Sequence, residues 1–70
     1  MRRCLLFPIV PDTEREMLLA LISAESLRFG LSSEEYLRKV WYHDQARKLG
    51  EHVASIMLDW LLRIVTGNVP

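Results

Sequence analysis

The sequence has almost nothing that could cross-link a small fold. Cys4 is the only cysteine among 70 residues, so a disulfide within the chain is excluded. The sequence also has no pair of Cys or His residues at the spacing typical of a zinc site. Nine Lys and Arg residues balance nine Asp and Glu residues, so net charge indicates no partner. A core of this size supplies only about 3 to 5 kcal/mol of stability. We therefore expect the chain to depend on close helix packing or on assembly.

The sequence also lacks a long hydrophobic run. The apolar stretch 4–10 is short, is interrupted by Pro8 and is followed by acidic residues, which is not typical of a secretory signal peptide. The closing segment 54–67 contains Asp59 and Arg63 and falls short of the roughly 20 apolar residues that a bilayer requires. We expect no membrane span, and a reducing compartment such as the cytoplasm.

A first helix is predicted over residues 12–29. Pro11 and Asp12 form a helix start, and acidic residues follow in the first turn, where the helix macrodipole favours them. Gly30 is expected to end this helix, because glycine readily adopts the left-handed backbone conformation that follows many helix C-termini. Apolar residues recur at helical period and predict a buried stripe. The stripe comprises Met17, Ala20, Leu21, Ala24 and Leu27, with Leu18 and Ile22 widening it.

A second helix is predicted to begin after Ser32, which forms a capping box with Glu35. Gly50 then leaves a choice between one long helix and two shorter ones. A glycine inside a helix costs about 1 kcal/mol, and the apolar seam passes through Gly50 without losing phase. We predict one continuous or gently kinked helix over 33–66, with a break at Gly50 as the alternative. The seam consists of Tyr42, Ala46, Leu49, Val53, Ile56 and Trp60.

These elements predict an all-α fold: a single small helical domain over 1–70, with a short extended arm (1–11) and a helical hairpin of helices 12–29 and 33–66. The second helix would be about twice as long as the first, so the hairpin covers only half of it. The uncovered apolar surface is of the kind that marks an interaction site. We therefore expect an oligomeric bundle, a homodimer or a higher assembly. Its predicted interface comprises Tyr42, Leu49, Val53, Ile56, Met57, Trp60, Leu61 and Ile64.

No catalytic, cofactor or metal motif is visible, and we predict that the protein is not an enzyme. His52, Ser55 and Asp59 lie along one predicted helix face, but His52 and Asp59 are about 10.5 Å apart along the axis, too far for a catalytic triad. His43 falls on the face opposite His52, which leaves no pair of metal ligands. The expected function is a small interaction module or regulatory subunit that binds itself or another protein through an apolar helix face.

A DNA-binding alternative rests on a resemblance. The stretch I-V-P-D-T-E-R-E-M-L-L-A-L, followed by G-L-S-S-E-E-Y-L-R-K-V, is similar to ribbon-helix-helix DNA-binding proteins, which include many antitoxins. The likeness covers about half of the chain, but the segment L-L-F-P-I-V (5–10), where those proteins have a strand, lacks the alternating polar residues that read bases. The resemblance implies a transcriptional regulator that contacts DNA phosphates through Arg2, Arg3, Ser32 and Ser33.

A basic ridge is a further candidate for phosphate contact. Lys39, His43 and Arg47 are spaced by four residues and would follow one helix face. Glu35 and Glu51 flank the ridge at its two ends, so a solvated and charge-balanced face is the competing interpretation.

Overall fold

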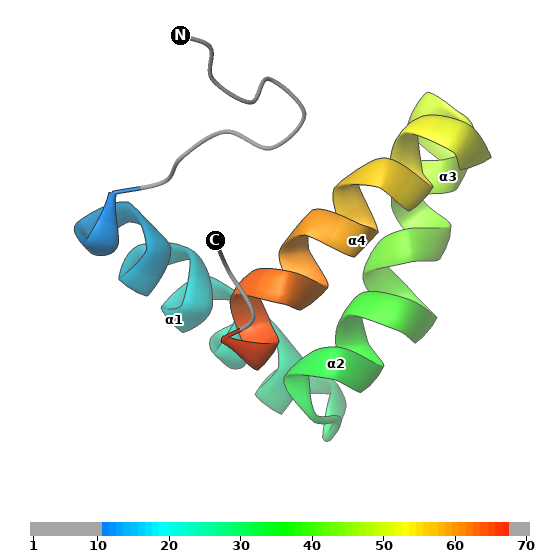
Figure 1. The fold of residues 1–70 in the computed structure, drawn as a ribbon. Coiled ribbons are helices and arrows are strands. Elements are labelled where there is room, and N and C mark those ends of the chain that lie inside the picture. The colour runs from blue at the N-terminus through cyan, green and yellow to red at the C-terminus, as the bar shows by residue number, and fades with distance from the viewer. Residues whose placement is uncertain (1–10, 68–70) are drawn as a thin grey trace, which may run out of the picture.

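The structure, a computed structural model, describes residues 11–67 and is helical there apart from short connections. The elements are α1 (Asp12–Phe29), α2 (Ser33–Tyr36), η1 (Leu37–Trp41), α3 (Tyr42–Leu49) and α4 (Glu51–Thr66). Because α2, η1 and α3 follow one another without a break, the described residues form three rods: α1, the α2–α3 helix and α4 (Figure 1). The all-α fold class is thus confirmed. The arm predicted over 1–11 falls, except for Pro11, outside the described residues.

α1 spans the range predicted from the sequence and ends in a Schellman motif. Gly30 has left-handed backbone angles, φ 69° and ψ 31°. Its N–H donates to the Leu27 carbonyl at 3.1 Å, and the Leu31 N–H donates to the Ser26 carbonyl at 3.0 Å. These two bonds satisfy carbonyls that the helix end would otherwise leave unpaired.

The α2–α3 helix begins with the predicted capping box, which is confirmed. The Ser32 hydroxyl accepts a hydrogen bond from the Glu35 N–H, and the Glu35 carboxylate accepts one from the Ser32 N–H, both at 3.2 Å. The Phe29 ring at the end of α1 packs against the Tyr36 ring, with centroids 5.7 Å apart. The connection between the first two rods is therefore fixed by backbone and ring contacts together.

The prediction of one helix over 33–66 is wrong, because the chain reverses at Gly50. Gly50 has φ 96° and ψ 153°, a region that is essentially restricted to glycine. Its N–H donates to the Ala46 carbonyl at 2.9 Å, and its carbonyl accepts from the Ala54 N–H at 3.1 Å. One residue therefore both ends α3 and begins α4, which runs back beside the α2–α3 helix (Figure 1). The chain follows the alternative, a break at Gly50.

A small core lies where the three rods meet. Leu37 of η1 is fully buried and packs with Ile22 of α1 and Leu61 of α4. Ser26 is also buried, and its hydroxyl donates to the Ile22 carbonyl at 2.6 Å, so the polar group is satisfied. Partly buried apolar side chains surround this cluster, namely Tyr36, Trp41, Leu58, Trp60, Leu62 and Val65. None of the helices in residues 11–67 has the length and apolar character needed to cross a membrane.

Candidate functional site

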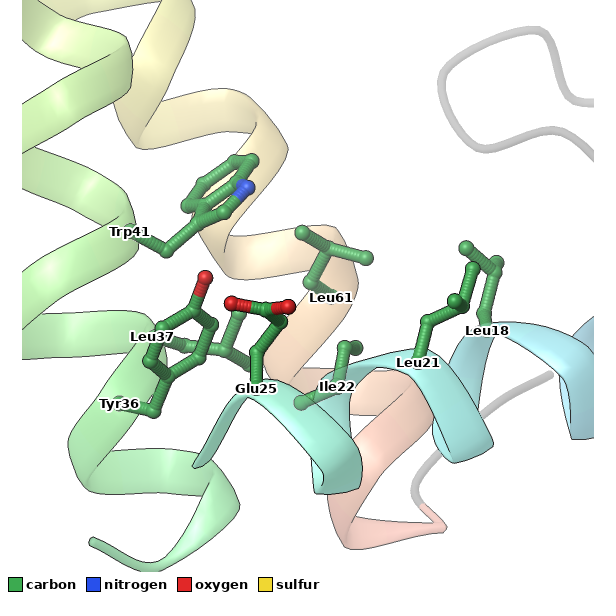
Figure 2. Close-up of a pocket in the computed structure, with 8 residues that line it drawn as sticks. All are labelled: Leu18, Leu21, Ile22, Glu25, Tyr36, Leu37, Trp41 and Leu61. Atoms are coloured by element: carbon green, nitrogen blue, oxygen red, sulfur yellow. The ribbon is translucent and has the colours of Figure 1, made fainter. Parts of the chain in front are cut away.

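An apolar groove opens between α1, the α2–α3 helix and α4 (Figure 2). Its volume is about 210 Å³. It is lined by Leu18, Leu21, Ile22, Glu25, Tyr36, Leu37, Trp41 and Leu61. A groove with so few polar groups offers a place to bury apolar side chains, and it offers little to orient a reacting substrate.

Two polar groups of the groove come from different helices. In Figure 2 the Tyr36 hydroxyl and the Glu25 carboxylate both extend toward Trp41. Burial raises the pKa of Tyr36 above its usual value of 10.0, and the negative charges of Glu25 and Asp44 raise this pKa further, while Arg28 opposes them. The phenol is therefore neutral near pH 7, where it can donate or accept a hydrogen bond but carries no charge.

A π-helical turn shapes the wall that the α2–α3 helix contributes. η1 begins at Leu37 and ends at Trp41, and both of these residues line the groove. Such single π turns inside α-helices are rare and occur frequently at functional sites. Neither residue belongs to the interface or to the nucleic-acid contacts predicted from the sequence. The available signal was the pair of apolar doublets Tyr36-Leu37 and Val40-Trp41, but their spacing does not distinguish a π turn from an α turn.

The five central residues of the stripe predicted to be buried on α1 lie instead on the surface, whereas Ile22, one of the two residues that widen the stripe, is buried. We call Met17, Ala20, Leu21, Ala24 and Leu27 the α1 outer face. Met17 and Leu21 are each 64% exposed and Leu27 is 78% exposed. The buried residues of α1 are Ile22 and Ser26. The expectation is wrong because α1 is apolar on both sides, so helical periodicity alone could not decide which side packs inward.

The eight predicted interface residues are distributed over the surface and the core. Leu49, Val53 and Ile56 are 49%, 43% and 52% exposed and form a second apolar patch beside the Gly50 turn, which we call the corner face. Leu61 and Ile64, by contrast, are buried in the chain's own core. The other three, Tyr42, Met57 and Trp60, are partly buried. The structure therefore leaves only part of the predicted set accessible to a second molecule.

The predicted nucleic-acid contacts are only partly within the described residues, since Arg2 and Arg3 lie outside them. Ser32 and Ser33 stand at the start of α2, where the Ser32 hydroxyl is already engaged in the capping box. Lys39 lies 4.0 Å from a Glu35 carboxylate oxygen. These side chains present no uncompensated positive charge of the kind that follows a phosphate backbone.

The other cation of the predicted ridge is also paired. Arg47 donates to the Asp44 carboxylate at 2.7 Å, and Lys48 lies 3.0 Å from the second oxygen of that carboxylate. The hydrogen bond from Lys48 and the neighbouring positive charges hold the pKa of Asp44 below its usual value. Arg47 therefore belongs to a local charge cluster on α3.

The residues weighed for catalysis or metal binding are not assembled into a site. His52, Ser55 and Asp59 are all exposed on α4, and Asp59 pairs with Arg63 at 3.2 Å. In the part of the chain that the structure describes, no group of three or more His, Cys, Asp or Glu side chains is placed to hold a metal ion.

Comparison with known proteins adds no relative: no family model, no curated protein and no solved structure matches this chain. The groove and the two exposed apolar faces are therefore the features that bear on function.

Proposed function

We propose that this protein is a small helical interaction module or regulatory subunit that acts through self-association, or through binding a partner protein, by an exposed apolar helix face. A homodimer is the primary form in this proposal. The observation that carries it is that α1 has apolar residues on both sides, while the chain covers only one of them.

The exposed side of α1 is unusual for an isolated domain. Contiguous apolar patches on a protein surface often mark sites of interaction. Here Met17, Leu21 and Leu27 each remain more than 60% exposed, whereas the inward side is held by Ile22. Full burial of one aliphatic side chain contributes roughly 1.5 to 3 kcal/mol, so covering this face would contribute as much as the small core itself. Self-association or a partner helix would supply that cover.

The two apolar faces differ in their suitability as the main contact of the proposed assembly. The α1 outer face extends along most of an 18-residue helix, whereas the corner face comprises Leu49, Val53 and Ile56 around one turn. A long helical face suits a second helix, because helices pack along rows of residues. We therefore assign the main contact to α1 and treat the corner face as the comparison.

Sedimentation equilibrium from low to tens of micromolar protein tests the proposal. We expect a dimer, and we expect Leu27→Gln to weaken it, because this side chain is 78% exposed and its replacement leaves the core intact. The matched variant is Ile56→Gln on the corner face, which is expected to leave the association constant unchanged. A folded, non-aggregating monomer at tens of micromolar would contradict self-association and leave partner binding as the remaining form of the proposal.

The DNA-binding alternative gains no support from the described residues, in which the ridge cations stand beside carboxylates. It is tested by titrating a DNA duplex at low salt. Binding whose logarithm falls steeply with the logarithm of salt concentration would favour a regulator. Absence of binding at low salt would remove that alternative.

A further inference from the structure

One row of residues along α1 has an acid at one end and a base at the other. Glu14, Met17, Leu21, Ala24 and Arg28 are spaced by three, four, three and four residues, so they form a single seam on the helix surface. Glu14 lies in the first turn and Arg28 in the last. The two are about 21 Å apart along the axis at 1.5 Å per residue. Each is seven residues from Leu21, so the two charged ends of the seam are equidistant from that leucine.

Every member of this seam is accessible. Met17 and Leu21 are each 64% exposed, and Glu14 and Ala24 are exposed as well. The Arg28 side chain is 74% exposed and lies 3.3 Å from Glu25. A guanidinium group has five N–H donors, so that contact leaves donors for a second carboxylate. The small Ala24 side chain would let another helix approach closely.

We propose that α1 packs against α1 of a second copy in antiparallel orientation, with Leu21 at the twofold axis and Glu14 of each copy beside Arg28 of the other. This inference rests on the proposed self-association and specifies its geometry. An antiparallel arrangement pairs opposite charges at both ends and also opposes the two helix macrodipoles. A parallel arrangement would place Glu14 against Glu14 and Arg28 against Arg28.

The groove supports the same placement. Leu21 belongs both to the seam and to the lining of the groove, so a second helix centred on Leu21 would also cover the groove's edge. In Figure 2 Leu21 and Leu18 extend from α1 on the side where Leu61 of α4 faces them. Apolar area on the seam and in the groove would therefore be removed from water by one contact.

Charge exchange between copies tests the orientation. The variants are Glu14→Lys, Arg28→Glu and the double change, and the measurement is the dimer dissociation constant at low salt. Each single change is expected to weaken its homodimer roughly tenfold, because two like-charged contacts replace two opposite ones. The double variant is expected to regain the wild-type constant. An equimolar mixture of the two single variants is expected to form a heterodimer of wild-type affinity.

Two controls separate this effect from changes in folding. Glu34→Lys makes the same charge change in the first turn of α2, off the seam, and is expected to leave the dissociation constant unchanged. Leu21→Cys in a Cys4→Ser background is expected to form a disulfide between copies on mild oxidation, whereas Ile56→Cys is not. Circular dichroism of each variant establishes that the helices are retained.

The outcomes distinguish the inference from the proposed function. A dimer whose dissociation constant is the same in all charge variants would overturn the antiparallel contact and leave self-association through another face. Preferential pairing of Glu14→Lys with the wild-type chain would indicate parallel helices and would also overturn it. A wild-type chain that stays monomeric would overturn both.

Discussion

α1 and α4 are similar in length and both rich in apolar residues, yet the fold covers them differently. α4 buries Ala54, Leu61 and Ile64. α1 buries one apolar residue, Ile22, together with Ser26, and leaves its other side open. α4 packs closely beside α3 and also meets α1, whereas α1 lies at the edge of the arrangement (Figure 1). Apolar content alone therefore does not decide burial; the position of a helix relative to its neighbours does.

The sharpest test of this contrast compares one leucine from each helix. Leu61→Ala on α4 removes a side chain that is 7% exposed, and we expect a loss of about 2 to 5 kcal/mol in the free energy of unfolding. Leu27→Ala on α1 removes one that is 78% exposed, and we expect a change within about 0.5 kcal/mol for the monomer. Urea unfolding at a concentration where the chain is monomeric measures both. Equal losses would show that α1 is covered within one chain.

The connections to the two helices provide the next comparison. Gly50→Ala forces a side chain into φ 96°, and we expect it to destabilise by about 1 to 3 kcal/mol. An added methyl group there would meet nothing within 4 Å, so the cost comes from the backbone alone. Gly30→Ala, at φ 69°, is expected to cost about 1 to 2 kcal/mol. Urea unfolding measures both, and stabilisation by Gly50→Ala would contradict the reversal of the chain at this residue.

The reversal of the chain at Gly50 shows which parts of the fold the sequence could predict and which it could not. The helix bounds of α1 and the capping box at Ser32 follow from local signals, because a stop glycine and a serine with a glutamate three residues on act on their own backbone. The turn at Gly50 does not follow from apolar spacing. The seam residues Leu49, Val53 and Ile56 on either side of the turn are 49%, 43% and 52% exposed, so the regular spacing that predicted one continuous helix does not mark a buried face.

The candidate site was less predictable for a related reason. Periodicity reveals that a helix has an apolar stripe, but α1 has apolar residues on two sides, and only the packing of Ile22 against Leu37 and Leu61 identifies the inward one. The groove depends on three segments that are far apart in the sequence. The π turn over 37–41 left no recognisable pattern in residue spacing.

A smaller effect is expected at the start of the helix that both α1 and α4 pack against. Ser32→Ala removes the capping hydroxyl, and we expect a loss of about 1 kcal/mol in the free energy of unfolding. Ser33→Ala is the matched control, because Ser33 is not the capping residue, and it is expected to change stability by less. Thermal unfolding followed by circular dichroism measures both variants. Equal effects would show that the capping bond contributes nothing.

The smallest expected effect reports how closely α1 approaches the α2–α3 helix. Burial is the main reason that the pKa of Tyr36 is raised, and the charge of Glu25 on α1 adds to it. Because the folded pKa lies above the unfolded value of 10.0, the stability that the neutral phenol contributes is present below that pH and is lost as pH rises through the folded pKa.

Phenolate absorbance during an alkaline titration measures the pKa of Tyr36 in a Tyr42→Phe background, because that change removes the second of the two tyrosines. Glu25→Gln is expected to lower this pKa toward its usual value without reaching it, since burial remains. An unchanged pKa would show that Glu25 lies farther from the phenol in solution than in the structure, and that α1 is less closely held.

The one-residue connection at Gly50 also bears on how fast the chain can fold. α3 and α4 meet directly after the turn, so closing this pair sacrifices very little chain entropy. α1 and α2 are likewise joined through a short link, Gly30 to Ser32. Chains dominated by contacts between sequence neighbours fold in microseconds to milliseconds. Refolding should therefore begin with a rapid phase whose rate is independent of protein concentration. Any association of copies should follow as a separate, slower phase whose rate increases with protein concentration.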